Sequence, residues 1–255
     1  MRSKLVKILI AVFAVCMIAP AFSAVENVKV GGDIAIWGVL RGDLQTTPDK
    51  LYTGFSQARV YVSADLSENV QTMVRLINER VWDSTTLNFG IDLDLAYIKV
   101  SDFLTPGLSL TIGRQEIELG EGLVVGSIYN VSNYLWLSTL TDLGLRKAFD
   151  AVRIDYGTEG LPVNLTAFYS RINEGGTVSD EKLFGVDLGF GLADIAKGDI
   201  YYVGNIEKPA TPKNINIHTA GLRTVIGIPG ISGLSLKAEY AKQFKDSKGW
   251  ALLAG

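Results

Sequence analysis

Apolar and polar residues alternate one by one over long stretches of this chain. Val60 and Val62, for example, alternate with Arg59, Tyr61 and Ser63. The same alternation recurs at 70–77, 108–113, 151–156, 163–170, 184–190 and 234–240. A period of two is typical of β-strands whose two faces meet different surroundings. Weaker candidates cover about 29–42, 91–100, 199–206 and 215–226, so the pattern predicts an all-β chain of about 11 strands.

Two architectures can use such strands. A secreted β-sandwich or solenoid would bury the apolar faces against another sheet. A membrane barrel would turn them toward lipid and line its lumen with the polar faces. The predicted strands have roughly 9–13 residues, which is longer than the usual strand of a soluble domain and sufficient for a tilted membrane strand. Strand length therefore favours the barrel.

The links between the predicted strands alternate between short and long. The long ones cover about 44–53, 83–90, 116–147, 172–182 and 207–214, and the short ones 67–69, 101–107, 157–162, 193–198 and 229–233. Outer-membrane barrels have short periplasmic turns and long outward loops, whereas a soluble sheet has no reason for this rule. The sequence thus predicts a transmembrane antiparallel β-barrel of the outer-membrane type. Aromatic residues near strand ends would suit its interfacial girdles: Trp37, Tyr97, Tyr156, Tyr169 and Tyr240.

The N-terminal segment has the organisation of a secretory signal peptide. Basic residues between Arg2 and Lys7 precede an apolar run over 8–19, and the small residues Ala21 and Ser23 follow it. Such a run is too short to span a bilayer as a helix. The predicted division is a signal peptide over 1–23 and a partial barrel over 24–255, exported to the outer membrane of a Gram-negative type of bacterium.

Composition excludes several classes of function. The chain has 255 residues, a formal net charge of −3, one histidine and one cysteine. Without the three basic residues of 1–23, the rest carries 21 basic and 27 acidic residues, a net charge of −6. We therefore expect no nucleic-acid partner, no His/Cys metal site and no cofactor.

A set of short motifs in the middle of the chain resembles a known family. The motifs are Gly113-Arg114-Gln115-Glu116, Gly120-Glu121-Gly122, Val125-Gly126, and Arg146 followed by Ala148-Phe149-Asp150-Ala151-Val152-Arg153. Their order and spacing resemble the alginate-export family of outer-membrane porins, over about residues 58–156. The resemblance implies a porin that moves an anionic polysaccharide.

Basic residues on the polar faces are the candidate pore-lining set. The set is Arg59, Arg75, Lys99, Arg114, Arg153 and Lys237. A guanidinium group in a narrow pore pairs bidentately with carboxylates and lowers the barrier for a polyanion, the role that the resemblance implies. The alternative is structural, because lumen arginines also pair with lumen carboxylates of the same chain.

The link over 116–147 is far longer than an ordinary connection, and such loops are usually functional. One hypothesis is that it folds into the barrel and narrows the pore, anchored by Tyr129, Tyr134 and Trp136. In the alternative, it covers the mouth of the barrel from outside.

The function predicted is passive movement of anionic, alginate-like polysaccharide or small hydrophilic solutes across the outer membrane. The alternative is a general or anion-selective diffusion porin, and an adhesive barrel without conductance is a third class. An enzyme is disfavoured, because His218 is the only histidine and no G-x-S-x-G motif occurs. The expected partner is outer-membrane lipid. If the barrel is closed, we expect it to be a monomer. Since single-chain bacterial barrels use an even number of strands, about 11 strands also suggest a fragment.

Overall fold

The computed structural model describes most of the chain beyond its N-terminal segment. The described residues are 25–41, 51–82, 90–126, 128–129, 145–146, 148–157, 162–173, 180–192, 195–208, 215–228, 231 and 234–255. Within them, no helix is long and apolar enough to cross a membrane.

Twelve strands form one antiparallel sheet, in which each strand pairs with its neighbours in the order β1-β2-β3-β4-β5-β8-β9-β10-β11-β12-β13-β14. Their bounds are β1 Glu26–Arg41, β2 Leu51–Ser67, β3 Val70–Val81, β4 Asp92–Val100, β5 Leu108–Gln115, β8 Phe149–Tyr156, β9 Val163–Asn173, β10 Asp180–Leu192, β11 Ala196–Lys208, β12 Ile215–Gly227, β13 Ser235–Lys245 and β14 Trp250–Ala254. Two short strands, β6 (Ile128–Tyr129) and β7 (Leu145–Arg146), pair only with each other. The all-β prediction and its sequential antiparallel order are confirmed.

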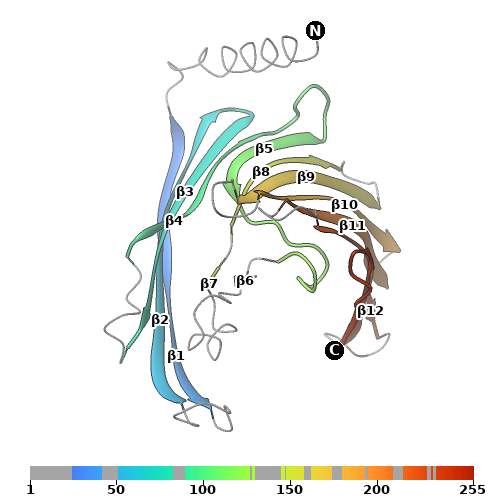
Figure 1. Cartoon of the computed structure of the whole chain (residues 1–255). Helices are drawn as coiled ribbons and strands as arrows, with labels where there is room; N and C mark the ends of the chain where they lie inside the picture. Colours follow the sequence, from blue (N-terminus) through green and yellow to red (C-terminus); the bar gives the residue numbers. More distant parts are fainter. Residues whose placement is uncertain are drawn as a thin grey trace.

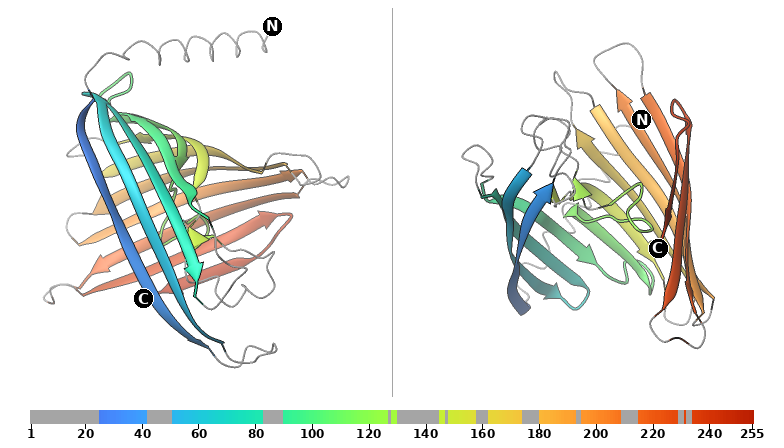
Figure 2. Two further views of the ribbon diagram at one scale, coloured as in Figure 1. Left: turned by 90° about the vertical axis from the view of Figure 1, so that its left-hand side faces the viewer. Right: turned by 90° about the horizontal axis from the view of Figure 1, so that it is seen from below.

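The sheet curls into a deep trough. Strands β1 to β4 form one side, and β8 to β12 form the other (Figure 1). The edge strands β1 and β14 lie on opposite sides of the trough (Figure 2), and the described residues do not pair them with each other. The segment after β5 and the pair β6–β7 lie within the concavity (Figure 1).

The two faces of the sheet have opposite chemistry. On the convex side, here called the outer face, Val60, Val62, Val152 and Ile154 leave 44–56% of their surface exposed. The concave side, here called the inner face, carries buried polar groups as well as a small apolar cluster. The predicted alternation therefore places apolar residues on the exposed outer face.

Residues 116–126 fold back onto the inner face. Ile117, Leu119 and Val125 are at most 3% exposed. They pack against residues of β8 to β11, namely Phe149, Ala151, Phe168, Leu183, Tyr201 and Val203. The segment is held in a compact turn, because the Leu119 amide donates to the Val125 carbonyl and the Gly122 amide to that of Leu119.

The sheet has twelve strands where alternation predicts about 11. Trp250–Ala254 forms a twelfth strand antiparallel to β13, with Trp250 opposite Lys242 and Ala254 opposite Ala238. This stretch is only five residues long and apolar throughout. It consequently lacks the alternation by which the other strands were recognised.

Gly113 offers a test of the β4–β5 pairing. Its φ is +120°, and a Cβ there would lie 2.3 Å from the Ala96 carbonyl oxygen. We expect Gly113→Ala to destabilise the sheet by about 1–3 kcal/mol, the usual cost of a strained backbone position. Gly38→Ala is the control, because a Cβ at Gly38 meets nothing within 4 Å. Urea titration followed by circular dichroism measures both, and equal midpoints would contradict the prediction.

Candidate functional site

The inner face carries a series of ion pairs along the trough. Near one edge, Arg59 of β2 contacts Asp33 of β1 at 2.8 Å. On the neighbouring strands, the two ends of the Arg75 guanidinium reach Asp94 of β4 at 2.5 Å and Glu116 at 2.6 Å. Glu116 begins the inward segment, so this arginine ties the segment to the wall at its start.

Glu121 ties the same segment to the opposite side of the trough. Its carboxylate accepts hydrogen bonds from Arg223 of β12, with the Arg223 Nε at 2.8 Å, and from the Lys237 Nζ of β13 at 3.3 Å. Arg223 also contacts Asp199 of β11 at 2.7 Å. One acidic residue of the segment is therefore held by basic groups of two adjacent strands.

The backbone beside Glu121 is held by a second carboxylate. The Glu121 amide donates to Glu239 Oε2 at 2.6 Å, and the Tyr201 hydroxyl donates to Glu239 Oε1 at 2.6 Å. Glu239 is completely buried. Gly120 has a φ of +62°, and a Cβ there would meet the Glu239 carboxylate at 2.6 Å. Only glycine lets the segment approach this closely.

The pKa of the Glu121 carboxyl lies below its ordinary value of 4.5, chiefly because Arg223 hydrogen-bonds to the charged form. Partial burial acts in the opposite direction, and Lys237 adds to the lowering. Glu121 therefore stays ionised, and its contacts stay formed, under mildly acidic conditions.

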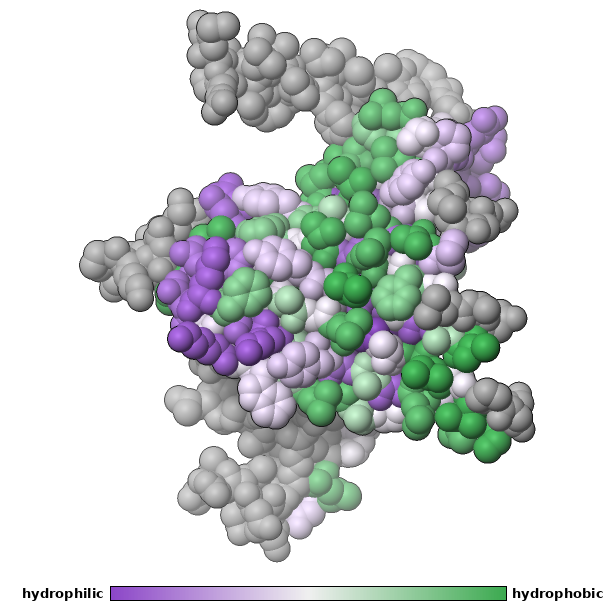
Figure 3. Space-filling model, turned by 90° about the vertical axis from the view of Figure 1, so that its right-hand side faces the viewer, coloured by the Kyte–Doolittle hydropathy of each residue, from purple (hydrophilic) through white to green (hydrophobic). Residues whose placement is uncertain are grey.

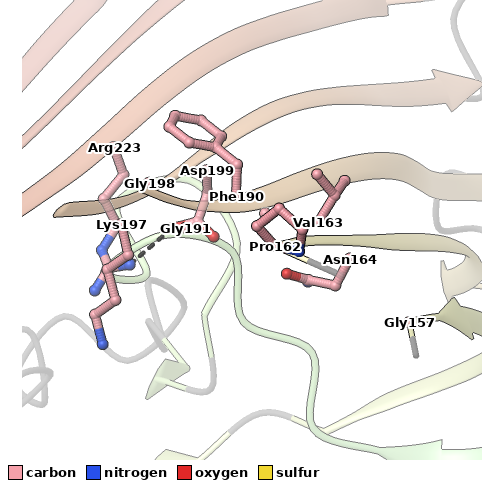
Figure 4. A pocket seen from close by; sticks show the side chains of 11 residues that line it. Gly157, Pro162, Val163, Asn164, Phe190, Gly191, Lys197, Gly198, Asp199 and Arg223 are labelled. Atoms are coloured by element: carbon pink, nitrogen blue, oxygen red, sulfur yellow. Dashed lines mark hydrogen bonds and ion pairs between the residues drawn. The ribbon is translucent and has the colours of Figure 1, made fainter. Parts of the chain in front are cut away.

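A cavity of about 370 Å³ opens on the wall near the ends of β9, β10 and β11. It is lined by Asn164, Lys197, Asp199 and Arg223 together with several glycines. Figure 4 shows Arg223 and Lys197 extending on the same side, with Arg223 bonded to Asp199. Charged side chains and glycine backbone thus border the space beside the Arg223 ion pair.

Most of the predicted pore-lining residues lie on the inner face. Arg59, Arg75 and Lys237 make the contacts described above, and Arg153 contacts Asp155 at 2.8 Å. Lys99 pairs in register with Thr111, which pairs on its other side with Arg153. Among the described residues of this face, Arg59, Arg75, Arg153 and Arg223 touch six carboxylates in all.

Arg114 lies on the other face. It pairs in register with Asp150, whose side chain is 67% exposed, and both alternate with residues that face inward. Its Nη1 is 3.4 Å from the Asp150 carboxylate, and its Nε donates to the Leu93 carbonyl. Arg114 is two residues from Ile112 on the same strand, so the two side chains share a face. Ile112 pairs with Val152 of the outer face.

The side chains of the three proposed constriction anchors are not among the described parts of the structure. Tyr134 and Trp136 lie outside the described residues, and for Tyr129 only the backbone in β6 is described. Residues 116–126, at the start of the same link, are described and lie against the wall.

His218 also lies on the outer face, away from these ion pairs. It stacks with Phe244 at a centroid distance of 5.8 Å. Among the described residues, no three His, Cys, Asp or Glu side chains are grouped so as to hold a metal ion.

Sequence reasoning placed Glu239 among the carboxylates of the inner face but missed Arg223 and Tyr201 as site residues. Their partners are far away along the chain, since Arg223 and Glu121 are 102 residues apart. The available signal was parity, because Arg223 alternates with the apolar Leu222 and therefore shares the inner face.

No protein-family model matches this chain, and no curated protein matches it. Among solved structures, it is similar to a mutant porin of Rh. blastica (TM-score 0.43, 12% identity, 89% of this chain and 88% of that chain). It is also similar to a loop-deletion mutant of OmpT, an outer membrane protein of Vibrio cholerae (TM-score 0.42, 12% identity, 88% and 84%). None of these matches supports the resemblance to the alginate-export family.

The contacts of Glu121 can be tested by thiol labelling. Val125 is 3% exposed, so a Val125→Cys reporter in a Cys16→Ser background should react slowly with maleimide. Adding Glu121→Gln removes the charge that Arg223 and Lys237 hold, and we expect labelling to become about tenfold faster, since hydrogen bonds between charged groups are commonly worth this much. Glu68→Gln, on the exposed β2–β3 turn, is the control. Equal rates in all three proteins would rule out a holding role for Glu121.

Proposed function

We propose that this chain forms the wall of an outer-membrane β-barrel channel through which small hydrophilic solutes diffuse passively. The observation that carries the proposal is the opposite chemistry of the two faces of a single sheet. Apolar side chains cover the outer face of successive strands, while ion pairs and buried polar groups occupy the inner face.

The outer face has the composition of a surface in contact with lipid. Its exposed residues include Ile34, Val60, Val152, Leu165, Val186, Ile200, Leu222 and Leu252. Burying one such side chain is worth about 1.5–3 kcal/mol, and soluble proteins rarely leave a continuous apolar surface of this extent in water. Strands of 8–17 residues, such as β5 and β2, suit a tilted membrane strand.

A sheet in a bilayer needs all its backbone groups paired, because unpaired N–H and C=O groups are costly in hydrocarbon. The edges β1 and β14 therefore require partners in the working channel. A closed wall around the inner face follows from this requirement, and the inner face then becomes a lumen.

The inward segment 116–126 would narrow this lumen. It contacts β3 through Arg75 and β12–β13 through Arg223 and Lys237, so it bridges the trough from one side to the other. This supports the constriction hypothesis for the start of the 116–147 link.

The charge of the wall favours small solutes over a polyanion. Each of the inner-face arginines Arg59, Arg75, Arg153 and Arg223 already contacts carboxylates of this chain, which weakens its attraction for an external anion. Transport of an alginate-like polysaccharide is the second candidate, and only the motifs around Gly113 and Gly120 support it.

We also propose that residues 1–23 act as a signal peptide for export and that outer-membrane lipid surrounds the barrel. A closed barrel of this kind needs no enzyme activity and no cofactor for its function. Conductance in a planar bilayer distinguishes a channel from an adhesive barrel, which would show none.

Planar-bilayer recording of the purified protein tests the function. We expect discrete conductance steps. In a KCl gradient, the reversal potential should indicate little ion selectivity or a preference for cations, because carboxylates outnumber arginines in the inner-face ion pairs. Strong anion selectivity with block by oligo-uronate would instead support the polysaccharide candidate. Absence of steps from a folded, membrane-inserted protein would overturn the channel.

The pH dependence of conductance tests the role of the segment. A carboxyl whose pKa is lowered by folding keeps its contacts at a pH above its pKa in the unfolded chain. It loses them as the pH falls through its pKa in the folded protein. Conductance should therefore stay constant from pH 7 down to the ordinary Glu121 pKa of 4.5. Below it, conductance should rise, because the segment loses its contacts with Arg223 and Lys237 and no longer bridges the trough. In Glu121→Gln, conductance should already be high at pH 7. A wild-type rise that is complete above pH 4.5 would contradict this assignment.

A further inference from the structure

An aromatic cluster lies on the outer face near the end of the sheet that carries the longer links. Phe184, Tyr202, His218 and Phe244 come from the adjacent strands β10 to β13. The His218 ring is 6.2 Å from Phe184, 5.6 Å from Tyr202 and 5.8 Å from Phe244, measured between centroids. Beside a band of hydrophobic residues, hydrophilic residues gather at one end of this face (Figure 3).

His218 is the polar centre of this cluster. It is 5% exposed although it faces outward, because the three aromatic rings cover it. Its Nδ1 bonds with the Tyr202 hydroxyl, and its Nε2 lies 2.7 Å from the Lys245 Nζ. Since an ammonium group can only donate, the Nε2 accepts this hydrogen bond and the imidazole is neutral.

Lys245 reaches His218 through an unusual backbone conformation. By alternation it would follow Ala241 and Gln243 to the inner face, but its φ is +73°, a value uncommon for a residue other than glycine. The turn brings its side chain to the outer face beside the cluster. Lys242, exposed on the same face, lies opposite Ala220, two register pairs from the His218–Phe244 pair.

Outward-facing bases are confined to this end of the sheet. Among the described residues, the strand lysines and arginines with side chains on the outer face are Arg80, Arg114, Arg171, Lys182, Lys242 and Lys245. All of them lie near strand ends on the side of the sheet where β3, β5, β9 and β10 meet the longer links. The opposite end of the outer face instead presents apolar residues such as Val163 and Leu236.

We propose that Lys242 and Lys245, beside the aromatic cluster, bind the phosphate headgroup of an anionic membrane lipid. The proposal rests on the proposed function, because it requires the outer face to lie in a bilayer. Aromatic rings are favoured at the headgroup level, where the acyl chains can lie on the apolar band and the headgroup beside the two lysines.

The geometry suits a phosphate oxygen. His218 takes one of the three Lys245 N–H groups and so fixes the position of the ammonium, while the remaining two stay available as donors. Lys242 adds a second ammonium group, and hydrogen bonds between an ammonium and a phosphate are strengthened by charge. Asp246 is the nearby acid, and one of its oxygens accepts the Asn216 amide at 2.7 Å.

Native mass spectrometry of the detergent-solubilised protein tests the site, with phosphatidylglycerol as the probe and diacylglycerol of the same acyl chains as the uncharged comparison. We expect wild-type protein to retain phosphatidylglycerol preferentially, and Lys242→Gln/Lys245→Gln to lose at least about tenfold in affinity, as expected for lost hydrogen bonds between charged groups. Lys242→Arg/Lys245→Arg should retain the lipid. Lys29→Gln, at the other end of the sheet, is the control.

Equal retention of phosphatidylglycerol by wild-type and Gln-variant proteins, with β-structure intact by circular dichroism, would overturn the proposal. So would full displacement of the lipid by inorganic phosphate, because the site would then take a soluble anion. Bilayer recording of the same double variant separates the two ideas. Conductance steps without lipid preference would defeat the lipid site alone, and lipid preference without steps would defeat the channel alone.

Discussion

The two-residue period of an extended chain is the constraint on which the rest of this structure depends. Successive side chains of a strand point to opposite faces, so alternation of the Val60 and Arg59 kind gives each strand one apolar and one polar face. Because neighbouring strands pair in register, as Arg59 does with Asp33 and Ile77, these faces add up over the sheet. One continuous surface becomes apolar and the other becomes charged.

The charged face then has to satisfy its own groups. A buried charge is costly unless it is paired and hydrogen-bonded, and here arginines and carboxylates of different strands neutralise one another. The inward segment takes part in this pairing through Glu116 and Glu121, while Ile117, Leu119 and Val125 bury apolar surface against the wall. Its position is therefore set by charge and by packing together, and the same contacts would narrow a lumen.

Alternation was sufficient to predict much of the fold and part of the candidate site. It placed Arg59, Arg75, Arg153 and Lys237 on the polar face, where the structure has them. The grouping of Arg114 with these residues was not supported, although its shared parity with Ile112 already indicated the outer face. The strand Trp250–Ala254 stood outside the count of about 11, because both of its faces are apolar and its sequence therefore shows no alternation.

The sequence by itself determined which side of each strand is apolar, since this depends only on residue type and a fixed backbone period. Only the tertiary structure decided which charges meet. Glu121, Arg223 and Glu239 come from distant parts of the chain and are brought together by the curvature of the sheet and by a glycine turn at Gly120. The backbone conformation of Lys245 likewise overrides its parity and carries it to His218. Contacts of this kind depend on how strands curve and where segments fold back, and local residue patterns do not encode either.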